Sequence, residues 1–241
     1  MKLREREGGV TAVNGGVLHR DMIQTAIMSC VKTVVLKHGN AEDVAATVTD
    51  FLIGGGIVVM PMDTSYGIAA DATNHAAVGA VIDIKGREPD KAISIVVEDL
   101  EEAERYAALD EQARRLWAAL LPGPLTLVVP SKDGTDLVDA VTALGKTIGL
   151  RQPDHALTQL VAERFAKPYT ATSANRSGNP PAYSADEFLA TLPADKAPHL
   201  VVDGGQLPLG PSSTVVSVGE SVEILRQGAV DANLVQTALG M

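Results

Sequence analysis

The chain has 241 residues and a formal net charge of −10, and 46% of its residues are hydrophobic but only 3% are aromatic. This size fits one domain with at most a short appendage, whose core consists mainly of Ala, Val, Leu and Ile. The negative charge argues against a constitutive nucleic-acid binder, because contacts to phosphates need a basic surface. A small basic pocket is still compatible with it and would attract small anions.

Cysteine and histidine usage excludes two further classes of protein. The single cysteine, Cys30, cannot form an intramolecular disulfide, and the five histidines have no partners at metal-ligand spacing. No hydrophobic run approaches the length that crosses a membrane, and the basic N-terminus is not followed by the hydrophobic segment of a secretory signal. We therefore expect a cytoplasmic protein without a structural zinc site.

Residues 1–40 differ from the rest of the chain and are predicted to form an N-terminal arm that is partly flexible. Residues 1–20 are rich in glycine and weakly periodic, and residues 23–36 are compatible with a short helix that runs into a strand. Asn40 and Asp43 then resemble an N-cap pair, which places the first regular helix directly after the arm.

Helical and strand patterns alternate beyond residue 40. Hydrophobic residues recur at helical spacing in some segments, and short β-branched runs mark the strands. Helices are predicted within 40–53, 77–84, 98–121 (two helices), 157–165 and 184–192. Strands are predicted at 57–60, 93–97, 125–129, 147–150, 169–172, 200–202, 214–217 and 222–225. The last two strands read as a hairpin, so the pattern predicts an α/β layer structure around a mixed sheet.

Polar segments follow the ends of several of these elements, where functional loops usually lie. They are Pro61–Gly67, Lys85–Lys91, Thr172–Gly178, and Pro211–Thr214 combined with Leu225–Gly228. Each segment alone is also compatible with an ordinary solvated loop. Together they supply Lys and Arg donors, hydroxyls and an Asn amide, which suit phosphate and carboxylate oxygens. No P-loop, dinucleotide-binding or serine-hydrolase fingerprint is present.

These segments, in this order and at this spacing, resemble the YrdC-type threonylcarbamoyl-AMP synthase family. The resemblance covers about residues 40–230. The family's motifs are matched by Pro61–Gly67, by Lys85, Arg87 and Lys91, by Pro122–Thr126, by Leu150–Pro153, by Thr172–Gly178, by Ser213–Val216 and by Arg226–Gly228. The resemblance implies a twisted open mixed sheet with flanking helices, and a catalytic domain over residues 41–241.

The resemblance also implies an activity. Members of the family are nucleotidyltransferases of tRNA processing that make L-threonylcarbamoyl-AMP from L-threonine, bicarbonate and ATP and release pyrophosphate. Mg²⁺ is expected with the phosphates of ATP, without a metal site made by the protein. The product is expected to pass to the machinery that makes N6-threonylcarbamoyladenosine in tRNA. Strong direct binding of tRNA is not expected, because the chain is acidic.

Residue roles are carried over motif by motif. A threonine carbamate oxygen must attack the α-phosphorus, so two anions meet, and Lys85 and Arg87 would offset their repulsion as the catalytic residues. The residues expected to bind substrate or nucleotide are Asp63, Thr64, Tyr66, Lys91, Arg151, Thr172, Ser173, Asn175, Ser213 and Arg226.

Departures from the family pattern leave two alternatives open. Met62 stands where the family has Thr, Pro89 is displaced by Glu88, and Ala92-Ile93 replaces the usual Pro-Leu. One alternative is a YciO-like paralogue that binds nucleotide or RNA without synthase activity. The other is an enzyme that forms carbamoyl-AMP.

Overall fold

The computed structural model describes residues 31–88, 92–192 and 196–240, and the elements below belong to these ranges. Its helices are α2 (Ala41–Ile53), α3 (His75–Lys85), α4 (Leu100–Tyr106), α5 (Glu111–Leu120), the 3-10 turn η1 (Asp139–Val141), α6 (Ala156–Phe165), α7 (Ala185–Leu189) and α8 (Ala232–Leu239). Its strands are β1 (Lys32–Val35), β2 (Val58–Pro61), β3 (Tyr66–Ala69), β4 (Ile95–Val96), β5 (Leu125–Pro130), β6 (Thr147–Arg151), β7 (Tyr169–Thr170), β8 (Thr172–Ser173), β9 (Leu200–Asp203), β10 (Thr214–Val218) and β11 (Val222–Arg226).

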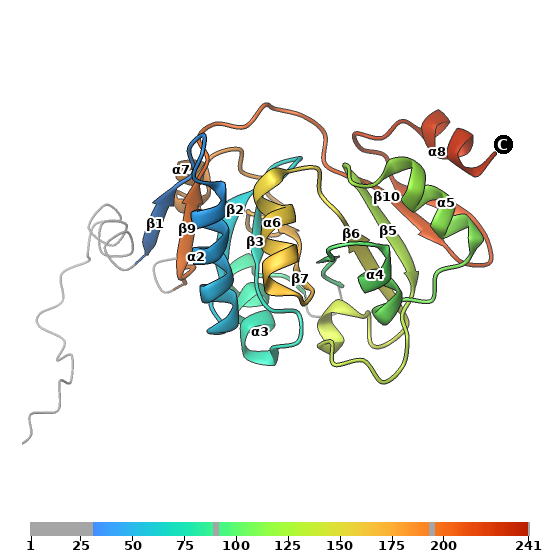
Figure 1. The fold of residues 1–241 in the computed structure, drawn as a ribbon, viewed down its shortest axis with the longest axis horizontal. Helices are drawn as coiled ribbons and strands as arrows, with labels where there is room; N and C mark the ends of the chain where they lie inside the picture. Colours follow the sequence, from blue (N-terminus) through green and yellow to red (C-terminus); the bar gives the residue numbers. More distant parts are fainter. Residues whose placement is uncertain (1–30, 89–91, 193–195, 241) are drawn as a thin grey trace, which may run out of the picture.

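The strands form two mixed sheets rather than one. A five-stranded sheet has the order β1-β9-β2-β3-β8, and a six-stranded sheet has the order β11-β10-β5-β6-β4-β7. The α/β class and the mixture of parallel and antiparallel pairs are confirmed, and β10 and β11 form the predicted antiparallel hairpin. The single strand predicted at 169–172 is wrong, because the chain passes there from β7 in one sheet to β8 in the other. Figure 1 shows the two sheets in the left and right parts of the molecule.

Strand β3, helix α8 and the short 3-10 turn η1 are missing from the sequence prediction. Strand β3 begins inside the segment that was expected to be a loop, and it pairs antiparallel with β2 from Val58↔Ala69 to Pro61↔Tyr66. Helix α8 packs against α5 at the C-terminal end of the fold (Figure 1). All three are short, so periodicity gives a weak signal for them.

The core follows the composition. The buried hydrophobic residues are mostly Ala, Val, Leu and Ile, as expected from the low aromatic content. One of two hydrophobic clusters lies under α2 and α6, which pack against each other beside the five-stranded sheet (Figure 1). The larger cluster includes residues of both sheets, of α3 and α5, and of α7.

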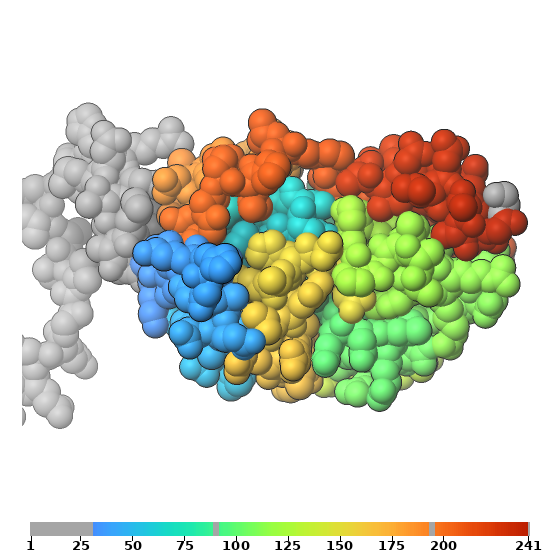
Figure 2. All heavy atoms as spheres, turned by 45° about the horizontal axis from the view of Figure 1, so that its top comes forward, coloured from blue at the N-terminus to red at the C-terminus, as the bar shows by residue number. Residues whose placement is uncertain are grey.

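A long connection joins the two sheets. Residues 204–213, here called the β9–β10 linker, run from the five-stranded sheet to the six-stranded sheet over the top of Figure 1. In Figure 2 its orange atoms lie across the surface toward the red C-terminal part. The linker delivers Ser212 and Ser213 to a cavity that both sheets border.

The N-terminal boundary of the fold lies within the predicted arm. Strand β1 pairs parallel with β9 from Lys32↔Leu200 to Val35↔Asp203, so the five-stranded sheet begins before residue 41. Residues 1–30, which include the predicted flexible segment, lie outside the described residues. Asn40 does precede α2, but its side chain makes no cap to that helix and instead accepts from Lys37 N and donates to Val35 O. The expected N-cap pair is therefore wrong, since Asn40 fixes the turn between β1 and α2.

Two truncations test where the folded unit begins. Deleting residues 1–20 is expected to leave the melting temperature nearly unchanged, because that stretch lacks a periodic hydrophobic face. Deleting residues 1–36 removes the pairing of β1 with β9 and is expected to lower it by several degrees, at about 2–4 °C per kcal/mol for a protein of this size. Thermal unfolding of both variants beside the full chain makes the comparison. Equal melting temperatures for the two truncated forms would contradict the assignment of β1 to the folded unit.

Candidate active site

A cavity of about 300 Å³ lies where the two sheets face each other, and we call it the central cavity. Its walls carry hydroxyl groups and three arginines, and none of the described residues that line it is a carboxylate. The lining residues are Met62, Thr64, Ser65, Tyr66, Gly67, Arg87, Ala92, Ser94, Thr126, Val128, Thr147, Gly149, Arg151, Ala171, Thr172, Ser173, Ser212, Ser213, Val215 and Arg226. Such a surface offers many hydrogen-bond donors and positive charge to an anion.

Lys85 shapes one wall of the cavity from behind. It is the last residue of α3 and is 2% exposed, and it does not line the cavity. Its Nζ donates to Ser173 O at 2.5 Å, to Asn175 Oδ1 at 2.8 Å and to Asn175 O at 3.1 Å. The ammonium group therefore fixes the turn after β8, and the role of direct catalytic contact predicted for Lys85 does not fit this position.

Burial perturbs the charge on Lys85. Removal from water, with the nearby Arg87 cation, lowers the pKa of Lys85 to about 7. The three oxygen acceptors favour the ammonium form, but burial opposes it more strongly.

Asn175 completes this wall rather than lining the cavity. Besides accepting from Lys85, its Oδ1 accepts from the Ser173 hydroxyl at 2.6 Å, and its Nδ2 donates to Asn179 O. Ser173 and Thr172 do line the cavity, as predicted. The matched segment Thr172–Gly178 thus supplies two lining hydroxyl residues and one internal brace.

Arg87 lies in the cavity wall, as predicted for a residue that meets substrate. Its Nη2 donates to Ala92 O at 2.6 Å, and burial lowers the pKa of its guanidinium. The predicted site residue Lys91 lies outside the described residues.

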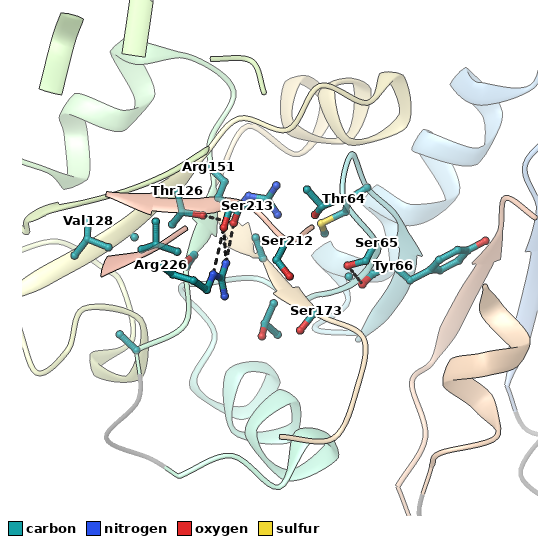
Figure 3. Close-up of a pocket in the computed structure, with 18 of the residues that line it drawn as sticks. Thr64, Ser65, Tyr66, Thr126, Val128, Arg151, Ser173, Ser212, Ser213 and Arg226 are labelled. Carbon is teal, nitrogen blue, oxygen red and sulfur yellow. Dashed lines mark hydrogen bonds between the residues drawn. The ribbon is translucent and has the colours of Figure 1, made fainter. Parts of the chain in front are cut away.

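A second cationic wall forms around Arg226, at the end of β11. Its Nη2 donates to Ser213 O at 2.8 Å and to Ser213 Oγ at 3.1 Å, and Ser213 Oγ also lies 2.9 Å from Thr126 Oγ1 (Figure 3). Burial and the nearby Arg151 lower the pKa of Arg226. The prediction that Ser213 and Arg226 act at one place is therefore supported by their contact.

The close packing around Gly228 explains why the motif Arg226-Gln-Gly228 ends in a glycine. A β-carbon at this position would overlap the backbone of Ser212 and Ser213, so no larger residue fits without moving that segment. The close approach holds the end of the β9–β10 linker against the loop after β11, and with it the two serines in the cavity wall.

Arg151 lines the cavity and is braced by Asp63 from behind. Arg151 Nη2 donates to Asp63 Oδ1 at 2.6 Å, and their side chains are only 9% and 5% exposed. Asp63 is not a lining residue, so the contact between Asp63 and ligand that was predicted does not fit its position. Thr64, the next residue, does line the cavity.

Tyr66 points away from the cavity (Figure 3). Its hydroxyl donates to Gly205 O at 2.8 Å and accepts from Gly204 N at 2.9 Å, so it anchors the β9–β10 linker. Adjacent residues of a strand face opposite sides, which is why Gly67 rather than the Tyr66 ring faces the cavity. The substrate contact predicted for the Tyr66 side chain is therefore not supported.

Met62 contributes a hydrophobic surface to this polar cavity. It is 3% exposed, and its side chain lies over Gly67, where an added β-carbon would be 2.5 Å from the Met62 sulfur. A threonine here would be shorter and would leave room above Gly67. The departure from the family pattern thus lies in the cavity wall itself.

Several lining residues were not predicted. Thr126 lies within the matched Pro122–Thr126 segment, so the motif itself was the signal for it. Ser212 lies within the candidate segment Pro211–Thr214. Ser94 and Thr147 carry no signal in a single sequence, because they reach the cavity only through the pairing and facing of the sheets.

Comparison with known proteins identifies the family. The Sua5/YciO/YrdC family model, which is described as "Telomere recombination", matches residues 50–228. The chain belongs to the Sua5/YciO/YrdC family. The matched range contains all the residues that line the central cavity. The predicted family membership is therefore confirmed.

Individual members give a more detailed comparison. The chain is 32% identical over 186 residues to the threonylcarbamoyl-AMP synthase of Bacillus subtilis, covering 76% of this chain and 53% of that relative. The structure of P. abyssi Sua5 complexed with L-threonine has a TM-score of 0.78 and 28% identity, covering 87% of this chain and 61% of that one. The chain thus spans about half of the Bacillus relative. E. coli YciO, at 20% identity with a TM-score of 0.74 and coverage of 85% and 98%, shares the fold.

Lys85 and Arg87 are expected to respond differently to the same substitution. Lys85→Met removes a donor that Ser173 O, Asn175 Oδ1 and Asn175 O share. The first two keep a second donor, but the carbonyl of Asn175 keeps none among the described residues, and an unsatisfied buried group costs about 1–3 kcal/mol. We expect it to lower the melting temperature by several degrees. Arg87→Met removes a cavity cation and is expected mainly to weaken binding of inorganic pyrophosphate, by about tenfold or more.

Thermal unfolding and calorimetric titration of pyrophosphate measure these two effects. The matched control is Arg105→Met, which removes an exposed cation that pairs with Glu101 on the surface. A stable Lys85→Met variant, or unchanged pyrophosphate binding by Arg87→Met, would be inconsistent with the positions described above.

Proposed function

We propose that this protein forms L-threonylcarbamoyl-AMP from L-threonine, bicarbonate and ATP, with release of pyrophosphate. It is then a nucleotidyltransferase whose product serves the N6-threonylcarbamoyladenosine modification of tRNA. Support comes from the family, from the name of the Bacillus subtilis relative and from the structural likeness to the P. abyssi protein complexed with L-threonine.

The observation that carries the proposal is the composition of the central cavity. Arg87, Arg151 and Arg226 face it from different segments, and most of the hydroxyl residues around them belong to the matched motifs. The reaction brings a carbamate and a triphosphate together, so most of the work is to offset negative charge and to align the reacting groups. A rigid wall of cations and hydroxyls supplies both without a protein nucleophile.

Each wall has a proposed part in the reaction. Arg87 stabilises the charge that develops on the phosphates as the carbamate oxygen attacks and pyrophosphate leaves. Arg151 and Arg226 hold anionic groups of the substrates, and Thr64, Thr172, Ser173 and Ser213 orient their oxygens. Lys85 and Asn175 act indirectly, because they hold Ser173 in place.

Mg²⁺ is proposed to enter with ATP. The described residues contain no group of three or more His, Cys, Asp or Glu side chains that would hold a metal ion, and the cavity lining offers hydroxyls instead. This donor set fits a cation carried mainly by phosphates, which Mg²⁺ commonly is. When bound, Mg²⁺ would neutralise phosphate charge, and we propose that the hydroxyls of Ser173 and Ser213 would meet its water shell.

The cellular setting follows from the same proposal. The product is reactive and is expected to pass to the tRNA threonylcarbamoyl-transfer machinery, which makes that machinery the partner. The net charge of −10 argues against strong direct binding of tRNA. No helix in the described part of the chain is long and hydrophobic enough to cross a membrane.

Pyrophosphate release tests the proposal. We expect it to require ATP, Mg²⁺, bicarbonate and L-threonine together, because the carbamate must form before it can attack. A coupled pyrophosphate assay with each component omitted in turn, and with other amino acids in place of threonine, makes the measurement. Mass spectrometry of the product checks its identity.

The outcomes separate the alternatives. Release that does not depend on threonine would replace the proposal with carbamoyl-AMP formation. No release under any combination would favour a YciO-like paralogue. Release that prefers another amino acid would point to Met62, whose thioether lies in the cavity wall.

A further inference from the structure

The ion pair between Asp63 and Arg151 connects the two sheets at the central cavity. Asp63 lies in the turn between β2 and β3 of the five-stranded sheet, and Arg151 is the last residue of β6 in the six-stranded sheet. Arg151 Nη2 and Asp63 Oδ1 are 2.6 Å apart, and the side chains are 9% and 5% exposed. Removing two charges from water is costly, so the pair needs either good hydrogen-bond geometry or a role other than stability.

The pair is incompletely satisfied. Asp63 Oδ2 and Arg151 Nε are both buried without a hydrogen-bond partner among the described residues, so one hydrogen bond joins the two side chains. A guanidinium has five N–H groups, and a bidentate pair would use two of them on the carboxylate. Because Nε is buried, the Nη groups are the donors that Arg151 can offer to a ligand in the cavity that it lines.

The surrounding charges explain why a carboxylate is needed behind Arg151. Arg226 lines the same cavity, and its pKa is lowered by burial and also by the nearby Arg151 cation. His155 and Tyr169 also lie near Asp63. Burial lowers the pKa of His155 and raises the pKa of Tyr169, so burial favours the neutral form of both side chains. Arg151 is then the cation that Asp63 compensates.

We infer that Asp63 is a positioning residue, which orients Arg151 and keeps it in the cavity so that the guanidinium binds an anionic group of the substrate. Asp63 itself does not touch the ligand, because it is absent from the cavity lining. The inference rests on the proposed function for the identity of the ligand, either the carboxylate of the amino acid or a phosphate of ATP. It does not depend on turnover.

The test is a double-mutant cycle on ligand binding. L-threonine and Mg–ATP are titrated separately by calorimetry into the wild type, Asp63→Asn, Arg151→Ala and the double variant. Asp63→Asn should lower the affinity for one of the two ligands by about tenfold or more, and tenfold corresponds to about 1.4 kcal/mol. The same substitution in the Arg151→Ala background should change that affinity less than about twofold, because its effect acts through Arg151.

Three controls keep the inference falsifiable. Asp154→Asn removes the same charge from an exposed aspartate three residues beyond Arg151 and should leave affinity unchanged. Asp63→Glu retains the charge and should recover part of the affinity. Inorganic pyrophosphate is the third control and is titrated if the wild type binds neither L-threonine nor Mg–ATP. Failure to bind those two substrates would contradict the proposed function but not the role of Asp63.

Several results would overturn the inference. One is an Asp63→Asn variant that melts at a lower temperature but binds every probe like the wild type, since the pair would then be structural only. Additive effects of the two substitutions would likewise show that Asp63 does not act through Arg151. Failure of the wild type to bind pyrophosphate as well as both substrates would remove the anion that Arg151 is held to meet.

Discussion

The amino group of Lys85 is removed from water, and a buried polar group of this kind is tolerated only where hydrogen-bond acceptors surround it. Its acceptors come from Ser173 and Asn175, which lie 88 and 90 positions further along the chain. These hydrogen bonds therefore join the end of α3 to the turn after β8. That turn places Ser173 beside Gly67 in the five-stranded sheet and gives the cavity one fixed wall.

The cations in the other cavity walls also need acceptors or a counter-charge, and they find them in different ways. Arg226 gives hydrogen bonds to the backbone and hydroxyl of Ser213, while Arg151 is compensated by Asp63. In each case an inward-facing cation is held by a group from another segment. An acidic chain thereby maintains a local concentration of positive charge, which attracts small anions without making the whole surface basic.

The β9–β10 linker ties these walls together. Tyr66 holds its beginning through Gly204 and Gly205, and the Tyr183 hydroxyl donates to Gly210 O at 2.6 Å near its end. Serines 212 and 213 then enter the six-stranded side of the cavity. The two tyrosines thus belong to the scaffold that positions the site.

Much of this arrangement is predictable from the sequence. The family resemblance assigned Arg87, Ser173, Ser213 and Arg226 to one site, and each carries a donor suited to anions. The sequence did not predict the direction in which some of these side chains point. Strand β3 is too short for its periodicity to be seen, so the outward orientation of Tyr66 was missed.

Contacts between residues far apart in the sequence could not be predicted for a related reason. A lysine in a basic segment looks the same whether it faces substrate or a backbone carbonyl 88 residues away. Asp63 and Arg151 were each predicted to bind ligand, but their contact with one another depends on how the two sheets face. The chemistry of the side chains was therefore easier to predict than which of them face the cavity and which contact one another behind it.

A structure of the protein with L-threonine and a non-hydrolysable ATP analogue bound tests the central claim most directly. The account predicts both ligands in the central cavity, with anionic oxygens within hydrogen-bond distance of Arg87, Arg151 and Arg226 and with the Lys85 contacts to Ser173 and Asn175 intact. Ligands bound outside this cavity, or phosphates in direct contact with Lys85 Nζ, would contradict it.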